Sequence, residues 1–173
     1  MPTRDPQPRP VTDVHQELQL TRPFRSESQE ATLALMRTAS MVTRHLGRVV
    51  EPHGLSLSQY NVLRILRGAG GDGLPTLAIR DRLIEEGATI TRLVDRLEAA
   101  GLVQRDRTQR DRRQVRCRIT EAGLRLLATL DPQIDAADQG AMAALPPAER
   151  RRLIELLAQV RAGVTAPPCS DRR

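Results

Sequence analysis

The chain has 173 residues, a length that fits one compact domain with its own core and flanking tails. Its formal net charge is +6, which favours a polyanionic partner such as nucleic acid or an anionic membrane surface. One phenylalanine, one tyrosine and no tryptophan leave almost no aromatic surface for stacking unpaired bases, which argues against single-strand binding.

Several other classes of protein are disfavoured by what the sequence lacks. No apolar run approaches the roughly 20 residues that span a bilayer, and the N-terminal MPTRDPQPRP has no apolar signal segment, so we expect a cytoplasmic protein without a membrane partner. Two cysteines argue against a disulfide framework. Three scattered histidines, with no metal-ligand spacing, nucleophile elbow or phosphate-binding glycine loop, predict neither an enzyme nor a metal or cofactor site.

Both ends of the chain predict poorly ordered tails. Residues 1–24 contain five prolines and few apolar side chains, and residues 165–173 are similar in composition. The sequence therefore predicts a single folded domain over residues 25–164.

The first long helix is predicted to begin after Ser26, which has Gln29 at the spacing of a capping box, and to end near Pro52 and Gly54. Its apolar positions alternate spacings of four and three, at Leu35, Ala39, Val42, Leu46 and Val49. An ordinary core helix has this pattern, and so has the seam of a helical dimer.

The next segments predict three shorter helices. Ser56 and Gln59 repeat the capping-box spacing before an apolar face that ends at a glycine cluster, and a short helix is expected from Thr76 to about Gly87. Residues 88–100 form the most amphipathic segment, with apolar side chains at Ile90, Leu93, Val94 and Leu97. Two short helices joined by a tight turn predict a helix-turn-helix.

After Gly101 the apolar period changes from about 3.6 to 2, which predicts a β-hairpin with a polar tip. Its second strand places Val115, Cys117 and Ile119 on one side and Arg116 and Arg118 on the other. Residues 101–118 hold seven arginines and two aspartates, so nearly the whole net charge lies here. A ribbon of this charge suits DNA phosphates or a narrow minor groove.

Two further helices are expected to complete the domain. Thr120 caps the first of them, and Pro132 is expected to kink it or end its first half. The last helix opens with Pro147 in its first turn and carries an apolar stripe at Leu153, Leu156, Leu157, Val160 and Val164.

On a helical wheel the face of residues 88–100 opposite the apolar stripe is narrow, small and partly basic. Small side chains allow close approach to the major groove, where arginine can reach guanine or phosphate; the alternative is an ordinary solvated surface. We expect contacts to base edges or the nearby backbone from Thr89, Thr91, Arg92 and Arg96. Phosphate contacts are expected from Thr76, Arg110, Arg112 and Arg113, with Asp111 pairing with Arg113 to fix its direction.

The stretch ATITRLVDRLEAAGLVQRDRTQRDRRQVRCRITEAGLRLL resembles the winged helix-turn-helix core of the MarR regulators, the multiple antibiotic resistance regulator family. The most specific pieces are TRLVDRLEAAGLV, the DRR of the hairpin tip and the following ITEAG, and the resemblance extends over about residues 26–164. It implies a mainly α fold with a small β-hairpin: a winged helix-turn-helix lobe over 55–120, and dimerisation helices over 25–54 and 121–164. It also implies that residues 88–100 are the recognition helix and that Asp111 and Arg113 match the family's aspartate-arginine pair in the wing.

The sequence departs from the family pattern at two places. The family commonly has glycine between the two helices of the motif, where this chain has Ile84, Glu85 and Glu86, and it usually starts the recognition helix with serine or threonine, where this chain has Ala88. The fold is expected to tolerate both changes, whereas an operator sequence does not transfer.

These observations predict a homodimeric regulator of transcription that binds double-stranded DNA at an inverted repeat. The resemblance implies a repressor released by a small phenolic or anionic ligand in the crevice between the dimer helices and the DNA lobe, and the polar groups near that crevice are Arg37, His45, His53 and Tyr60. Two alternatives are a winged-helix adaptor for protein interactions and a redox sensor using Cys117 or Cys169, although Cys117 is expected to be a buried structural thiol.

Overall fold

The computed structural model describes residues 13–84, 89–107 and 115–165, which fall into two compact units divided after Asp138. The first unit contains α1 (Val14–Glu17), α2 (Glu27–Val50), the short 3-10 helix Glu51–His53, α3 (Leu57–Gly68), the 3-10 helix Gly70–Asp72, β1 (Leu74–Pro75), α4 (Thr76–Arg80), α5 (Ile90–Ala99), β2 (Val103–Arg107), β3 (Val115–Ile119) and most of α6 (Glu121–Ala141). The second contains the end of α6 and α7 (Pro147–Thr165). The predicted fold class, mainly helical with a small β-hairpin, is confirmed.

The start of α2 is fixed by the predicted cap. The Ser26 hydroxyl accepts a hydrogen bond from Gln29 N at 3.2 Å, and the Gln29 side chain accepts one from Arg25 N at 2.7 Å. The helix ends at Val50, where the 3-10 turn containing Pro52 begins. Both predicted boundaries are confirmed.

Residues 13–24, which the sequence predicts as part of a poorly ordered tail, contain the short helix α1 and contacts with α2. Asp13 caps α1, and the His15 ring lies edge-on to Phe24 with ring centroids 5.5 Å apart. Glu17 Oε2 accepts a hydrogen bond from Arg37 Nε of α2 at 3.1 Å. The segment is held by contacts that include this aromatic pair, this ion pair and a hydrogen bond between His15 Nε2 and the Arg22 carbonyl at 2.9 Å, and none of them makes a periodic pattern that a sequence could display. Residues 1–12 lie outside the described residues, and Thr165, predicted as tail, is the last residue of α7.

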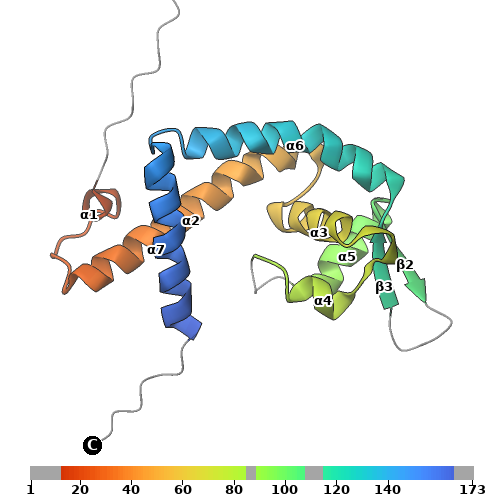
Figure 1. Cartoon of the computed structure of the whole chain (residues 1–173), viewed down its shortest axis with the longest axis horizontal. Helices are drawn as coiled ribbons and strands as arrows, with labels where there is room; N and C mark the ends of the chain where they lie inside the picture. Colours follow the sequence, from red (N-terminus) through yellow and green to blue (C-terminus); the bar gives the residue numbers. More distant parts are fainter. Residues whose placement is uncertain (1–12, 85–88, 108–114, 166–173) are drawn as a thin grey trace, which may run out of the picture. The chain divides into compact units, whose positions relative to one another are not determined.

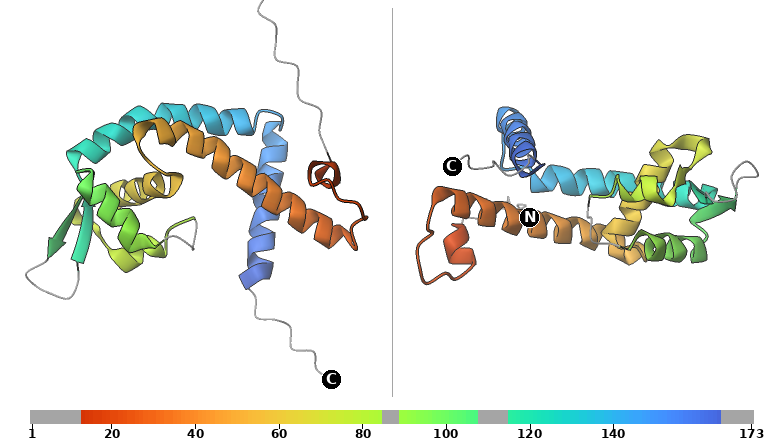
Figure 2. Two further views of the ribbon diagram at one scale, coloured as in Figure 1. Left: turned by 180° about the vertical axis from the view of Figure 1, so that it is seen from behind. Right: turned by 90° about the horizontal axis from the view of Figure 1, so that it is seen from below.

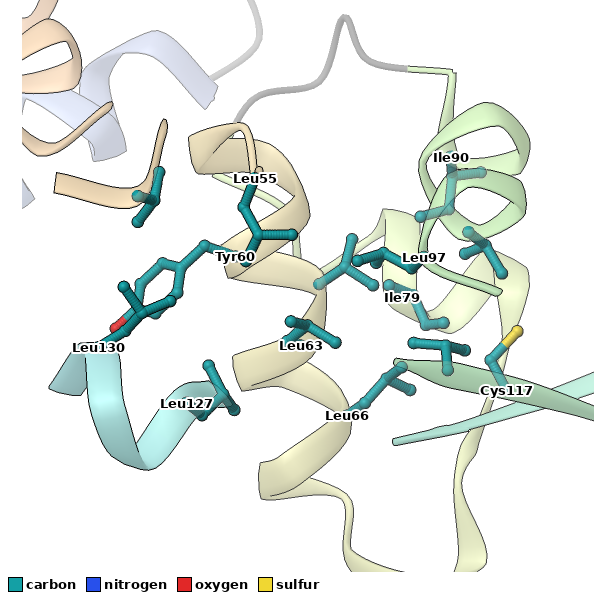
Figure 3. Close-up of a cluster of buried hydrophobic side chains, with 14 of the residues drawn as sticks. Leu55, Tyr60, Leu63, Leu66, Ile79, Ile90, Leu97, Cys117, Leu127 and Leu130 are labelled. Atoms are coloured by element: carbon teal, nitrogen blue, oxygen red, sulfur yellow. The ribbon is translucent and has the colours of Figure 1, made fainter. Parts of the chain in front are cut away.

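The core of the first unit is built around α3. Its N-terminus has the predicted capping box, with Ser56 Oγ accepting from Gln59 N and Gln59 Oε1 from Ser56 N. Leu63 and Leu66 are fully buried and lie between α6 on one side and α4, α5 and the sheet on the other (Figure 3). The fully buried side chains that complete this core include Val50, Val62, Ile79, Val94, Leu97, Cys117, Leu127 and Leu130.

The third helix is shorter than predicted. α4 ends at Arg80, whereas the sequence favoured a helix up to about Gly87. After Arg80 the backbone tightens, with Leu83 N donating to the Arg80 carbonyl three residues back, and Leu83 packs against the core. The residues here are good helix formers, so the turn is imposed by this tertiary contact, which local propensity does not encode.

The sheet has three antiparallel strands in the order β1-β3-β2. The predicted hairpin is present, with Arg105 opposite Cys117 and Val103 opposite Ile119. The two-residue strand β1, which the sequence did not predict, adds Leu74 opposite Cys117 on the other edge. Figures 1 and 2 show α3, α4 and α5 gathered beside this sheet at one end of the unit.

Two glycines mark close backbone approaches around the sheet. Gly73 precedes β1 with a φ of 60°, and a Cβ there would lie 2.5 Å from the Cys117 carbonyl oxygen. Gly123, in the first turn of α6, would place a Cβ 2.5 Å from the Leu102 carbonyl oxygen. Both positions therefore require a residue without a side chain.

Helix α6 begins as predicted, since the Thr120 hydroxyl accepts from Gly123 N at 3.2 Å and donates to the Gly101 carbonyl at 2.7 Å. It continues through Pro132 to Ala141, so Pro132 does not end it. In the second unit, α7 begins with Pro147 as predicted, and none of its residues is buried. None of the helices in the described part of the chain is both long and apolar enough to cross a membrane.

Candidate nucleic-acid interface

Helix α5 has the two faces that the sequence predicted. Ile90, Val94 and Leu97 are buried against the core. The opposite side is exposed and consists of Thr91, Arg92, Asp95, Arg96 and Ala99. The expected recognition segment 88–100 is a helix from Ile90 to Ala99 with Thr89 at its N-cap, and Ala88 lies outside the described residues.

Arg92 and Arg96 lie one turn apart on this exposed face. Within residues 13–84, 89–107 and 115–165, neither guanidinium forms an ion pair or hydrogen bond with the protein. Both charges are therefore available to a partner. Thr89 and Thr91 are exposed as well, so the four residues expected to contact bases or the nearby backbone lie together.

The two arginines of β3, Arg116 and Arg118, are used differently. Arg116 donates from Nε to the Asp72 carbonyl at 2.9 Å and from Nη2 to the Gly73 carbonyl at 3.0 Å. Arg118 Nε lies 3.3 Å from Asp106 Oδ2 on the neighbouring strand. Arg116 therefore ties β3 to the backbone before β1, and Arg118 pairs with Asp106 across the hairpin, so fewer hairpin arginines are free for a partner than the sequence suggests.

Arg105 is also engaged by protein groups. Its Nη2 lies 2.6 Å from Asp95 Oδ1, and its Nη1 donates to Glu98 Oε2 at 2.7 Å. The predicted contacts at the hairpin tip, Arg110, Asp111, Arg112 and Arg113, lie outside the described residues.

Thr76 starts α4 as predicted, but its hydroxyl lies 3.8 Å from Cys117 Sγ and the residue is half-buried. A phosphate contact through this hydroxyl would require it to turn away from the sheet. Cys117 itself has no exposed surface, as expected for a structural thiol, and Cys169 lies outside the described residues. An oxidant cannot reach the Cys117 sulfur unless the lobe opens, which argues against this residue as a sensor.

A pocket of about 590 Å³, part of it open to solvent, lies within residues 12–138 between α2, α3 and α6. Most of the surface that lines the pocket is apolar, as is usual for small-ligand sites. The lining residues are Thr43, Leu46, Leu57, Ser58, Tyr60, Asn61, Arg64, Leu83, Ile84, Ile134 and Asp138.

Of the four residues expected to line a ligand site, Tyr60 lines this pocket and the other three do not. Arg37 is bound to Glu17, His45 is exposed on α2, and His53 lies in the 3-10 turn after that helix. A role of these three residues in ligand binding stays a prediction.

Arg64 is a pocket residue that the sequence analysis missed. It lies four positions after Tyr60, so both project from the same side of α3, and its Cζ is 5.9 Å from the centroid of the Tyr60 ring. The i, i+4 spacing from Tyr60 could have pointed to Arg64 in the sequence. Burial raises the pKa of the Tyr60 phenol, an effect that the positive charge of Arg64 partly opposes.

Comparisons with known proteins agree with this geometry. The model of the MarR family matches residues 55–115, the segment from α3 to the start of β3. The HTH-type transcriptional regulator TtmR of Methylorubrum extorquens is 32% identical over 152 residues, which cover 84% of this chain and 76% of TtmR.

Two solved structures extend the similarity. A MarR transcription factor from Planctomyces limnophilus is 37% identical, with a TM-score of 0.61, and the match covers 79% of this chain and 99% of that one. CouR from Rhodococcus jostii RHA1, solved with p-coumaroyl-CoA bound, is 26% identical with a TM-score of 0.64, and the match covers 79% of this chain and 95% of CouR. Together with the exposed arginines of α5 and the adjoining β-hairpin, these similarities show that the chain belongs to the MarR family of winged helix-turn-helix transcriptional regulators, which bind DNA.

Proposed function

We propose that this protein is a homodimeric repressor that binds an inverted-repeat operator and is released by a small ligand. The exposed face of α5 carries the proposal, because Arg92 and Arg96 are free of protein partners among the described residues and stand beside small side chains. A helix of this kind can enter a major groove about 12 Å wide and place a guanidinium against guanine O6 and N7. A duplex is the ligand that this surface fits best.

Exposed apolar side chains support the homodimer. Helix α7 is 19 residues long, yet none of its residues is buried, and Ile154 and Val164 are 64% and 79% exposed. On α2, Met36 and Met41 are exposed as well. A soluble monomer rarely leaves so many large apolar side chains uncovered, whereas a second copy of the chain would bury them.

Selection of bound fragments from random duplex DNA tests the operator. Two recognition helices related by a twofold axis require half-sites about 10 to 10.5 base pairs apart, centre to centre. Sedimentation of the complex should give two chains per duplex. A single unpaired half-site, or a monomer on DNA, would contradict the homodimer and leave the family assignment intact.

The pocket between α2, α3 and α6 is the proposed effector site. Its apolar lining accepts a flat hydrocarbon body, while the Tyr60 hydroxyl and the Arg64 guanidinium offer donors to a phenolic or anionic head group. CouR, a relative of the same family, was solved with p-coumaroyl-CoA bound. A ligand that prefers the non-binding conformation by roughly 1 to 3 kcal/mol would release DNA effectively.

Screening of phenols and aromatic carboxylates by thermal shift, followed by DNA titration of each hit, tests the effector site. We expect Arg64→Gln to abolish the response to an anionic hit and to leave DNA affinity without ligand unchanged. Repression is tested separately, by a reporter gene behind the selected operator. Expression should fall when the protein is supplied and recover when the hit is added.

A further inference from the structure

The side chain of Arg105 lies along α5 and is mostly shielded from solvent. Arg105 is in β2, and its guanidinium is within 2.7 Å of carboxylate oxygens of both Asp95 and Glu98. Its Nη2 also donates to the Thr91 carbonyl at 3.5 Å. Positions 91, 95 and 98 lie on one side of α5 and span two turns of the helix. The planar guanidinium of Arg105 therefore links the wing, formed by β2, β3 and their connection, to two turns of α5.

The charges of α5 explain why this contact matters for a polyanionic partner. Between Ile90 and Ala99 the helix carries two arginines and two acids, so it has no net charge of its own. Two free carboxylates next to DNA phosphates would cancel the attraction of Arg92 and Arg96. Arg105 forms ion pairs with both carboxylates. Together with the four charged residues of α5 it gives a net positive charge.

The surroundings of Arg105 favour a persistent pair. Its side chain is 24% exposed, less than that of either partner, so solvent screens the interaction less than it would at an open surface. Burial opposes the charged guanidinium, but the hydrogen bond to Asp95 and the charge of Glu98 outweigh it and raise the pKa of Arg105. The two arginines of β3 make other contacts, since Arg116 binds backbone carbonyls and Arg118 pairs with Asp106.

We propose that Arg105 is a positioning residue for DNA recognition, which holds α5 against the wing and keeps Asp95 and Glu98 away from DNA while making no DNA contact itself. The proposal rests on the proposed function, in which α5 occupies the major groove. It assigns Arg105 a role different from that of the wing-tip arginines, which are proposed to touch phosphate directly.

The test is a double-mutant cycle on duplex affinity at several salt concentrations. Arg105→Gln should weaken binding about tenfold, because it frees both carboxylates, but by less than about threefold in the Asp95→Asn/Glu98→Gln background, where no carboxylate remains. The slope of log affinity against log salt should stay as in the wild type. A lost phosphate contact would reduce that slope by about 0.9.

Arg125→Gln is the matched control. It removes an arginine from an exposed pair with Glu121 on α6 and should change affinity by less than about twofold. Arg105→Lys keeps the charge and loses the planar fork, so it should give an intermediate loss that the same double substitution relieves. Thermal unfolding of each variant corrects the titrations for the fraction folded.

Two results would overturn the proposal: undiminished affinity in Arg105→Gln, or a reduced salt slope with the same loss in both backgrounds, which would make Arg105 a phosphate contact. Failure of the wild type to bind any selected duplex would instead overturn the proposed function. The two failures are therefore distinguishable.

Discussion

Arg67 of α3 and Asp131 of α6 form a bidentate ion pair, with Nη1 2.5 Å from Oδ2 and Nη2 3.2 Å from Oδ1. It joins the helix at the centre of the DNA lobe to the helix that leads into the second unit. Two parallel hydrogen bonds fix the direction between these helices as well as their distance.

We expect Asp131→Asn to lower the free energy of unfolding by about 1 kcal/mol, because both side chains are about a third exposed and water screens part of their attraction. Urea titration measures the change. Glu121→Gln, which breaks the exposed pair with Arg125, is the control and should cost less than about 0.5 kcal/mol. Equal effects in the two variants would mean that the bidentate geometry adds nothing.

Leu63 is fully buried where α3 meets both of its neighbours (Figure 3). Leu63→Ala should therefore destabilise the fold by about 2 to 5 kcal/mol, since it loses buried apolar surface and leaves a cavity. Leu77→Ala changes the same residue type on α4, where the side chain is 62% exposed, and should shift the urea midpoint little. Similar midpoints for the two variants would contradict the packing described here.

Gly73→Ala should destabilise the protein by more than about 1 kcal/mol, because a Cβ at a φ of 60° would meet the Cys117 carbonyl oxygen. Gly71→Ala, two residues earlier, introduces the same atom where nothing lies within 4 Å and should be tolerated. Thermal unfolding of the two variants makes the comparison. Equal melting temperatures would show that β1 can move aside at little cost.

The helices and the hairpin could be predicted because each is encoded locally. The capping box of Ser56 and Gln59 predicts the start of α3, and the alternation of apolar and arginine residues around Cys117 predicts β3. The end of α4 at Arg80 and the two-residue strand β1 could not be predicted in this way. Both depend on contacts with distant residues, namely the packing of Leu83 on the core and the pairing of Leu74 with Cys117.

The candidate site was predictable to a similar degree. The exposed face of α5 follows from its period of 3.6, and the structure places Thr91, Arg92 and Arg96 as expected. The roles of the wing arginines could not be separated by sequence, since Arg105 and Arg116 look alike in an alternating strand. Only the folded chain shows that one binds two carboxylates and the other two backbone carbonyls.

Base reading and backbone binding should be separable by mutation. Arg92→Ala is expected to weaken the selected operator by about ten- to a hundredfold and nonspecific duplex much less, because a guanine contact is lost. Arg113→Ala is expected to weaken both duplexes alike, because it removes a phosphate contact. Gel-shift titrations give each variant's affinity for the operator relative to nonspecific duplex. An equal loss on both duplexes in Arg92→Ala would show that Arg92 contacts the DNA backbone.

The alkaline titration of Tyr60 should report the burial of its ring. Tyr60 is the sole tyrosine and the chain has no lysine, so few other groups titrate with it. Burial raises its pKa above 10.0, and the neutral phenol is therefore favoured in the folded state. The tyrosinate absorbance should appear at higher pH in the native protein than in urea, and stability should decline as pH rises above about 10. Tyr60→Phe removes the signal, and coincident midpoints in water and urea would contradict the burial.

Gly123 leaves no room for a Cβ beside the peptide carbonyl of Leu102, so two stretches of main chain 21 positions apart in sequence come close together at the base of the β-hairpin. Side chains change rotamer and adapt to their neighbours, but a peptide group has no such freedom. The direction of the hairpin relative to α6 is consequently set by backbone geometry. In a library randomised at position 123, selection for folded protein should therefore restore glycine.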